Sequence, residues 1–327
     1  MAVIRFYNKR FYSNPIQVNV ENDLKNENYG GQARIYSWKF RNKKFIVKAI
    51  PDDSEIFRRM RDIYYALSDR KRRKIPHSIF LRGIPVAQGL GTPEEFKFRT
   101  AKSVYLLVFR YTYGEILSEY FKKRKEPPLS DVRKNIAKKL LDILIYMQDR
   151  NVIHGDLYPD NFLVDRNGQV FIMDFEGAGV MNSNRRFWIW KPTVLGKDYI
   201  FPNPPEVKRT GVPSFFSDRW IGVFLIFWTL VGIHPLPFLI RIDNKALEDL
   251  YNNTDKNKHQ WPPVIKSTCK YIQKEYPIEK FRTFMEHYFG DTNFGRILFL
   301  TYIIGFKEPS KRPSFREVKV SLKGVIE

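Results

Sequence analysis

His154-Gly155-Asp156-Leu157-Tyr158-Pro159-Asp160-Asn161 is the stretch that decides the fold, together with Asp174-Phe175-Glu176 further along the chain. Between them, the mostly apolar residues 169–173 predict a short strand. A lone Asp-x-x-x-x-Asn is a weak signal, because Asp and Asn are common turn residues. With Asp174 placed directly after a strand, the pattern predicts a phosphoryl-transfer site. Asp156 would orient or deprotonate the acceptor hydroxyl, and Asn161 and Asp174 would bind the Mg²⁺ ions that bridge the phosphates.

The stretch 154–161 resembles the catalytic loop of the protein-kinase superfamily, and Asp174-Phe175-Glu176 resembles its Asp-Phe-Gly turn. Phe45-Ile46-Val47-Lys48 is similar to the strand that bears the phosphate-contacting lysine. Pro204-Pro205-Glu206 resembles the Ala-Pro-Glu motif, and Ser217-Asp218-Arg219-Trp220 resembles the start of the central helix of the large lobe. Residues 308–314 resemble the segment whose arginine pairs with the glutamate of the Ala-Pro-Glu motif. The matches follow the family's order from about residue 16 to about residue 320, and this collinearity argues more strongly than any single motif.

The resemblance implies an α+β, bilobal fold of the protein-kinase type. A small antiparallel-sheet lobe would cover residues 1–111 and bind the nucleotide, and a large helical lobe would cover residues 112–327. The apolar residues 103–113 predict a buried strand that leads into the hinge between the lobes, and the period of the apolar residues in 131–150 predicts a helix. The implied cofactors are ATP and Mg²⁺.

Seven residues are implied to contact or position the nucleotide: Gly30, Gly31, Ala33, Lys48, Asp62, Arg110 and Tyr111. The first three belong to a glycine-containing turn whose backbone amides can cover phosphates. Lys48 would contact the α and β phosphates, and Asp62 has the best spacing for the acid that pairs with it. Backbone groups of Arg110 and Tyr111 would bind the adenine edge.

Three further residues are implied to stabilise the large lobe. Glu206 and Arg312 would form a buried ion pair, and Asp218 would cap the catalytic loop through backbone amides. His154 is expected to pack structurally and not to act as a general base.

Four departures from the family pattern leave the acceptor open. Residues 199–206 form a longer segment than the peptide-docking loop of a standard protein kinase. Gly155 replaces the arginine that pairs with a phosphorylated activation loop in many protein kinases, which predicts activity independent of that phosphorylation. Tyr158 stands where serine/threonine kinases usually have lysine, and Glu176 replaces the glycine of Asp-Phe-Gly. The loop also resembles those of aminoglycoside phosphotransferases and choline kinases, and Tyr158 is shared with lipopolysaccharide core kinases. The sequence therefore favours a protein serine/threonine kinase, with a small-molecule or glycan kinase and a pseudokinase scaffold as alternatives.

The composition sets the remaining expectations. The 327 residues have a formal net charge of +21, which predicts either a polyanionic partner or a solvated basic surface without one. The single cysteine, Cys269, indicates a reducing, cytoplasmic compartment. The apolar run 220–233 is shorter than the roughly 20 residues that cross a bilayer, so a buried helix is expected and no integral membrane segment.

Overall fold

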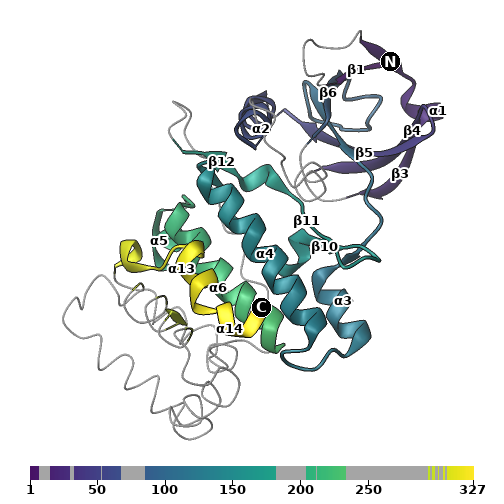
Figure 1. The fold of residues 1–327 in the computed structure, drawn as a ribbon. Helices are drawn as coiled ribbons and strands as arrows, with labels where there is room; N and C mark the ends of the chain where they lie inside the picture. The colour runs from purple at the N-terminus through teal and green to yellow at the C-terminus, as the bar shows by residue number, and fades with distance from the viewer. Residues whose placement is uncertain are drawn as a thin grey trace, which may run out of the picture. The chain divides into compact units, whose positions relative to one another are not determined.

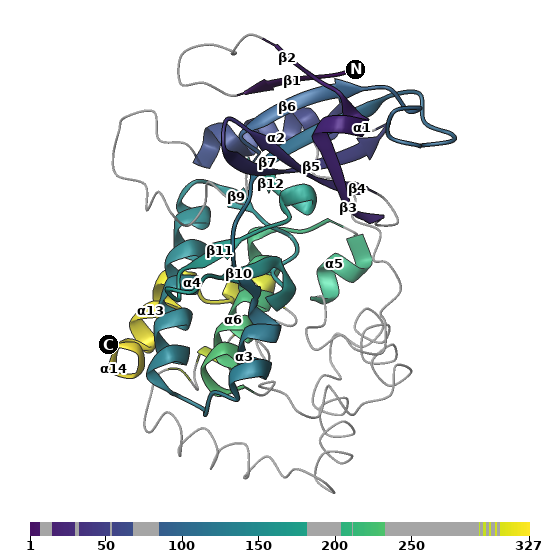
Figure 2. The same ribbon diagram turned by 90° about the vertical axis from the view of Figure 1, so that its right-hand side faces the viewer.

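Strands with alternating apolar side chains form an antiparallel sheet in the N-terminal part of the chain, as the sequence predicts (Figures 1 and 2). The computed structural model describes residues 1–6, 15–29, 33–52, 54–67, 85–181, 204–210, 212–232, 294, 297–298, 301, 305 and 308–327. The sheet has seven strands in the order β2-β1-β6-β7-β5-β4-β3. Their bounds are β1 Ala2–Phe6, β2 Ile16–Val18, β3 Leu24–Tyr29, β4 Arg34–Phe40, β5 Lys43–Pro51, β6 Ala87–Gly91 and β7 Val104–Arg110.

One face of the sheet is the core and the other holds the candidate site. On β5, Phe45, Val47 and Ala49 are buried, whereas Ile46 and Lys48 lie on the opposite face because successive side chains of a strand alternate. The ring of Phe6 on β1 stacks on Trp38 of β4 at 5.9 Å, although these strands are not neighbours in the sheet order. The sheet is therefore curled around its aromatic core, as in a half-barrel.

Short elements complete the first compact unit, which comprises residues 1–117, 149–156 and 160–188. They are α1 Val20–Asp23, α2 Ser54–Leu67, β8 Glu115–Ile116, β9 Val152–Ile153, η1 Pro159–Asn161, β10 Phe162–Val164, β11 Val170–Ile172, η2 Phe175–Gly177 and β12 Gly179–Val180. β10 pairs with β11 and β8, and β12 pairs with β9. The predicted strand 169–173 is thus confirmed as β11. The helix α2 packs on β7, β9, β12 and η2.

Helices dominate the second compact unit, which comprises residues 118–148, 157–159 and 189–327. The described elements are α3 Leu117–Arg124, α4 Asp131–Asp149, α5 Pro205–Thr210, α6 Phe215–Val231, η4 Pro309–Lys311, α13 Phe315–Ser321 and α14 Lys323–Ile326. The predicted α+β class with a sheet lobe and a helical lobe is confirmed. Because the compact units are discontinuous in sequence, the predicted lobe boundary at residue 111 stays a prediction.

Residues 220–231 of the apolar run fall in α6 and form a buried helix as predicted, whereas residue 233 lies outside the described residues. Ser214 and Ser217 form a reciprocal capping box at its start, and Gly232 ends it in the left-handed conformation at φ 84°. Trp220, Phe224 and Phe227 lie on successive turns and are buried, so the helix is enclosed by other parts of this unit. Within the described ranges, no helix is both long and apolar enough to cross a membrane.

Candidate functional site

Lys48 and Asp174 form an ion pair in the first compact unit. Lys48 Nζ lies 3.5 Å from Asp174 Oδ1, and the side chains are 19% and 43% exposed, so both remain accessible to a ligand. β4 and β7 flank β5 and fix Lys48 opposite Ile35 and Leu107. Asp174 itself follows β11 in the left-handed conformation, at φ 57° and ψ 62°. This conformation turns the chain from the strand into η2 and presents the carboxylate to Lys48.

Asp156 and Asn161 are joined within the predicted catalytic loop. Asn161 Nδ2 donates to the backbone oxygen of Asp156 at 2.7 Å and to its carboxylate Oδ2 at 2.8 Å. The backbone N–H of Met173 donates to Asn161 O at 2.7 Å, which ties this loop to the residue before Asp174. Gly155 precedes Asp156 at φ 77°, a conformation that glycine adopts without strain. The structure thus brings together the four residues predicted as catalytic: Lys48, Asp156, Asn161 and Asp174.

The carboxyl group of Asp156 has a raised pKa. Burial is the main cause, because it disfavours the charged form, and the negative charge of Asp174 acts in the same direction. The hydrogen bond from Asn161 opposes both effects, and the resulting pKa is about 6. A carboxylate of this kind is ionised at neutral pH and is a better proton acceptor than an ordinary aspartate.

His154 is buried and connects the backbone at Asp156 with the backbone at Met173, the residue before Asp174. The side chain is fully buried, and Nε2 is 2.8 Å from Met173 O while Nδ1 accepts from the backbone N–H of Asp156 at 3.3 Å. Its ring packs edge-on against Phe175 with centroids 4.9 Å apart. Burial lowers the pKa of His154, so the imidazole is neutral and donates from Nε2 to Met173. These contacts agree with the structural role expected for His154.

Two oxygen ligands fit a magnesium ion here. The Asn161 amide donates both hydrogen bonds to Asp156 through Nδ2, so its Oδ1 is the atom that would bind the metal together with the Asp174 carboxylate. Among the residues that the structure describes, no cluster of three or more His, Cys, Asp or Glu side chains could bind a metal by itself. A donor set of one carboxylate and one amide suits Mg²⁺, which usually keeps waters and takes its other ligands from phosphates.

The predicted hinge residues lie at the end of β7. Arg110 is paired with Phe45 across the sheet, and its side chain is exposed. The backbone N–H of Tyr111 donates to Lys44 O at 3.1 Å, and Lys44 Nζ lies 3.9 Å above the Tyr111 ring. Because the Tyr111 N–H donates to Lys44, it does not serve the adenine edge in this structure, and base contacts by the other backbone groups of Arg110 and Tyr111 stay a prediction.

The structure describes only some of the other residues that were predicted to contact or position the nucleotide. Gly30 and Gly31 lie outside the described residues. Ala33 is buried just before β4. Asp62 is half-buried on α2, and its pairing with Lys48 stays a prediction.

Sequence reasoning missed the apolar part of the site. Ile46 and Phe109 lie opposite each other on β5 and β7, on the same face as Lys48, and Ile35 lies directly opposite Lys48 on β4. All three are only half-buried, unlike the residues on the core face of the sheet. The alternation of side chains along β5 was a signal that could have identified Ile46, whereas Ile35 and Phe109 come near Lys48 only through the pairing of β4 and β7 with β5. They form an apolar surface on the face of the sheet that carries Lys48, the residue predicted to contact the phosphates, and such a surface is suited to a nucleotide base.

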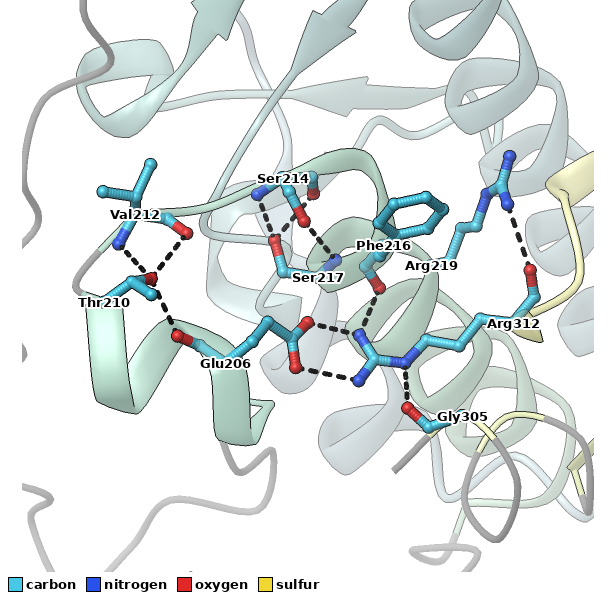
Figure 3. Close-up of polar contacts among 9 residues, drawn as sticks. All are labelled: Glu206, Thr210, Val212, Ser214, Phe216, Ser217, Arg219, Gly305 and Arg312. Carbon is cyan, nitrogen blue, oxygen red and sulfur yellow. Dashed lines mark hydrogen bonds and ion pairs between the residues drawn. The ribbon is translucent and has the colours of Figure 1, made fainter. Parts of the chain in front are cut away.

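Glu206 and Arg312 form the predicted ion pair in the second compact unit (Figure 3). Arg312 is 1% exposed, and both its terminal nitrogens donate to the Glu206 carboxylate, with Nη2 at 2.9 Å from Oε2. Arg312 also donates to the backbone oxygens of Gly305 at 2.8 Å and Phe216 at 2.7 Å. Every nitrogen of the guanidinium is thus satisfied, which is the condition for burying its charge.

Asp218 lies in the first turn of α6 and is 4% exposed. Its backbone N–H donates to Ser214 O at 3.0 Å. The role predicted for its side chain, capping the catalytic loop, stays a prediction.

Comparison with known proteins agrees with this geometry. A family model described as "Protein kinase domain" matches residues 94–319, which is more than half of the chain. The chain belongs to the protein kinase domain family. The match begins after Lys48, so the assignment of Lys48 depends on the geometry of the sheet and its contact with Asp174.

Several curated protein kinases are similar to this member of the family. "CBL-interacting protein kinase 25" of rice is 27% identical over 189 residues, which is 56% of this chain and 35% of that protein. "Aurora kinase A-A" of Xenopus laevis is 28% identical over 175 residues, 53% of this chain and 39% of that protein. "CBL-interacting serine/threonine-protein kinase 15" of Arabidopsis thaliana is 26% identical over 175 residues, which is 54% of this chain and 39% of that protein. The alignments thus cover well under half of each relative's length.

Proposed function

We propose that this chain transfers the γ-phosphate of ATP to a serine or threonine hydroxyl of a protein. The observation that supports the proposal most directly is the arrangement of Lys48, Asp156, Asn161 and Asp174 in one compact unit. A cation lies 3.5 Å from the predicted metal-binding carboxylate, and a carboxylate of raised pKa is hydrogen-bonded to the predicted amide ligand. Family membership and the serine/threonine kinase named among the relatives favour a protein acceptor.

Each residue has a separate role in the proposal. Lys48 binds and neutralises phosphate oxygens, and Ile35, Ile46 and Phe109 contact the base. Asp156 holds the acceptor hydroxyl in line and accepts its proton, while Asn161 keeps the Asp156 carboxylate in place. Asn161 and Asp174 would hold Mg²⁺, which when bound neutralises the charge of the transferred phosphoryl group. Positioning and electrostatics of this kind account for most of the catalysis in phosphoryl transfer.

The partners and the compartment are also proposals. A cytoplasmic location would follow from the single cysteine. A polyanionic partner would be attracted by the four consecutive exposed cations Lys122, Lys123, Arg124 and Lys125 at the end of α3. Arg59 and Arg133 do not belong to such a surface, since both are buried.

The test is transfer of labelled γ-phosphate from ATP in the presence of Mg²⁺, with acid hydrolysis of the labelled protein to identify the phosphorylated residue. Label on serine or threonine of an added protein, absent from the Asp156→Asn variant, would support the proposal. Label found only on added sugars, lipids or amino-alcohols would indicate a small-molecule kinase. Nucleotide binding without transfer to any acceptor would indicate a pseudokinase scaffold.

A further inference from the structure

The turn that joins β4 to β5 is a short cationic hairpin (Figure 1). Phe40 pairs with Lys43 across the hairpin, so the loop consists of the two residues Arg41 and Asn42. Four of the six residues 39–44 are lysine or arginine, and all four side chains are exposed: Lys39, Arg41, Lys43 and Lys44. The hairpin therefore presents a concentrated positive charge to the solvent.

Little of this charge is compensated. Among the residues that the structure describes, no carboxylate forms an ion pair with any of the four cations. The pKa of Glu27 on β3 is lowered first by a hydrogen bond with Ser37 and further by the charges of Lys44 and Lys25. Glu27 is exposed, so the solvent weakens this attraction. Because two lysines act on the same carboxylate, the surface keeps a net positive charge.

Two features of the hairpin oppose its own stability. Lys39 lies directly opposite Lys44, and like charges at such a position destabilise a sheet. Arg41 and Asn42 have φ angles of 45° and 61°, as a two-residue turn of type I′ requires. Asparagine adopts this left-handed conformation readily, whereas arginine does so with strain. The sequence thus keeps cations here although they lower local stability, which indicates that the charge itself has a role.

Aromatic side chains hold the hairpin in one conformation. Phe40 stacks on Trp38 with ring centroids 5.0 Å apart and on Phe6 with centroids 5.8 Å apart, so its ring belongs to the core of the sheet. The Arg41 guanidinium lies 5.2 Å from the centre of the Phe40 ring. A cation that is already held in place loses less conformational freedom when it binds an anion.

Exposed aromatic rings continue the cationic surface. Lys44 lies on the same face of β5 as Lys48, and its Nζ is 3.9 Å from the centre of the Tyr111 ring. The ring of Tyr113 packs edge-on against Tyr111, with centroids 4.7 Å apart, and Tyr113 is 74% exposed. Phosphate-binding cations and an exposed aromatic ring therefore lie side by side within one compact unit.

We propose that this hairpin, together with Tyr113, binds single-stranded nucleic acid. The four cations contact phosphates, and Tyr113 stacks on a base, which is how proteins bind single strands without sequence preference. The net charge of +21 attracts such a polyanion to the protein. The inference is independent of the proposed kinase function, because none of these five residues is assigned to phosphoryl transfer.

Other anionic partners use less of this surface. An acidic peptide would pair with the cations, but its carboxylates offer no ring that stacks on Tyr113. An anionic membrane would favour an apolar side chain at the tip of the hairpin. The apolar residue there, Phe40, is instead packed against Trp38 and Phe6. The combination of cations with an exposed ring thus favours nucleic acid.

The test is binding of a fluorescein-labelled single-stranded RNA of mixed sequence and about 20 nucleotides to the full chain. Fluorescence anisotropy gives the association constant at several salt concentrations. The triple variant Lys39→Gln, Arg41→Asn and Lys43→Gln should bind about tenfold more weakly. The slope of log association constant against log salt should fall by about 2, since each phosphate contact on a single strand contributes about 0.7. Tyr113→Ala should weaken binding on the order of tenfold with the slope unchanged.

Two controls separate this binding site from stability and from net charge. Arg41→Asn alone should weaken binding without lowering Tm, because asparagine adopts the left-handed conformation more readily than arginine. The matched triple variant Lys138→Gln, Lys311→Gln and Lys323→Gln removes the same charge at exposed positions elsewhere, and it should bind RNA like the wild type.

Four results would overturn the inference. The wild type could fail to bind the RNA, or the two triple variants could lose affinity equally, which would show attraction by net charge alone. A greater loss in Lys122→Gln, Lys123→Gln and Lys125→Gln would place the polyanion on α3 instead. Tighter, hairpin-dependent binding of polyglutamate or of phosphatidylserine vesicles would identify an acidic peptide or a membrane as the partner.

Discussion

Asp156 shows how neighbouring residues set the chemistry of a single side chain. Burial and the charge of Asp174 raise its pKa to about 6, and the amide of Asn161 limits the rise. Without that hydrogen bond the carboxyl group would be protonated over more of the physiological range. With it, the group is ionised at neutral pH and still accepts a proton readily.

The first prediction concerns the pH dependence of transfer. Below about pH 6 the Asp156 carboxyl is protonated and cannot accept the hydroxyl proton, so kcat/KM should fall tenfold per pH unit on the acid side. The measurement is a pH profile of transfer at saturating Mg²⁺, with stability checked across the same range. An acid limb centred near 4, the ordinary value for aspartate, would show that Asp156 is not the titrating group.

The second prediction concerns stability. The folded pKa of Asp156 is raised above its unfolded value of 3.8, so the folded state binds more protons and stability is lost as pH rises through about 6. At pH 8 the ionised group costs up to about 3 kcal/mol relative to a neutral one. Asp156→Asn should therefore raise Tm at pH 8 and have a smaller effect at pH 4. Equal shifts at both pH values would contradict the assignment of the pKa.

The sequence predicted the polar part of the site because those residues sit in motifs with fixed spacing. Lys48, Asp156, Asn161 and Asp174 could each be predicted from the chain alone, and their roles stay predictions. Phe109 could not, because its proximity to Lys48 depends on the pairing of β5 with β7. The burial of Arg59 is also a property of packing, because Arg58 and Arg61, its neighbours in the sequence, are more accessible.

At the scale of elements, α6 depends on close packing against α13. Gly222 is buried in the middle of α6, and a Cβ added there would lie 2.5 Å from Cε1 of Phe315. Such a distance requires the phenyl ring to move, and Phe315 is itself only 3% exposed. The glycine is therefore required by the neighbouring helix and not by a turn.

The third prediction follows from this contact. Gly222→Ala should destabilise the protein by about 1–2 kcal/mol, because overpacking outweighs the better helix propensity of alanine. Gly324→Ala in α14 is the matched control, since a Cβ there meets nothing within 4 Å and should raise stability by up to about 1 kcal/mol. The measurement is chemical unfolding of both variants. Stabilisation by Gly222→Ala would contradict the packing of α6 on Phe315.

The element ends were harder to predict than the elements themselves. The predicted strand 103–113 is observed as β7 Val104–Arg110, because the chain leaves the sheet after Tyr111 donates its N–H to Lys44. The predicted helix 131–150 is observed as α4 Asp131–Asp149. Periodicity defines the body of an element, whereas its ends depend on individual hydrogen bonds.

At the scale of the whole molecule, long-range polar contacts hold segments that are far apart in sequence. Arg312 joins α5 through Glu206, the start of α6 through Phe216 and the segment at Gly305, and Arg219 donates to Arg312 O at 3.0 Å (Figure 3). The guanidinium also lies 4.7 Å from the centre of the Trp220 ring. A single side chain thus satisfies groups from several elements.

The fourth prediction tests this role. Arg312→Met should destabilise the protein by about 3–5 kcal/mol, because it leaves the Glu206 carboxylate and two carbonyl groups without their partner. Arg316→Met is the matched control on the neighbouring turn, where the side chain is exposed and the change should be within about 0.5 kcal/mol. Thermal unfolding of the two variants provides the comparison. A similar Tm for both would show that the buried pair does not stabilise the helical unit.

The order of the motifs along the chain was enough to predict the fold class, whereas the full sheet was not predictable. The strand β1 and its pairing with β6 bring together residues more than 80 positions apart, as in the pair Ile4 and Gly89. No local signal marks that pairing, because it depends on how the sheet curls. The contact between Phe6 and Trp38 is visible only in the folded chain.

The central claim is that the four polar residues of the site perform phosphoryl transfer and do not merely bind nucleotide. The most direct measurement compares the wild type with the variants Asp156→Asn and Asp142→Asn. Asp142→Asn is the control, because Asp142 forms a partly exposed ion pair with Lys319 and is not one of the four site residues. Mg²⁺–ATP affinity and the single-turnover rate of transfer are measured on the same preparations. We expect unchanged affinity in all three proteins and a rate reduced roughly 10²–10⁴-fold in Asp156→Asn alone. Equal transfer rates in wild type and Asp156→Asn, or no transfer by a wild type that binds Mg²⁺–ATP, would contradict the claim.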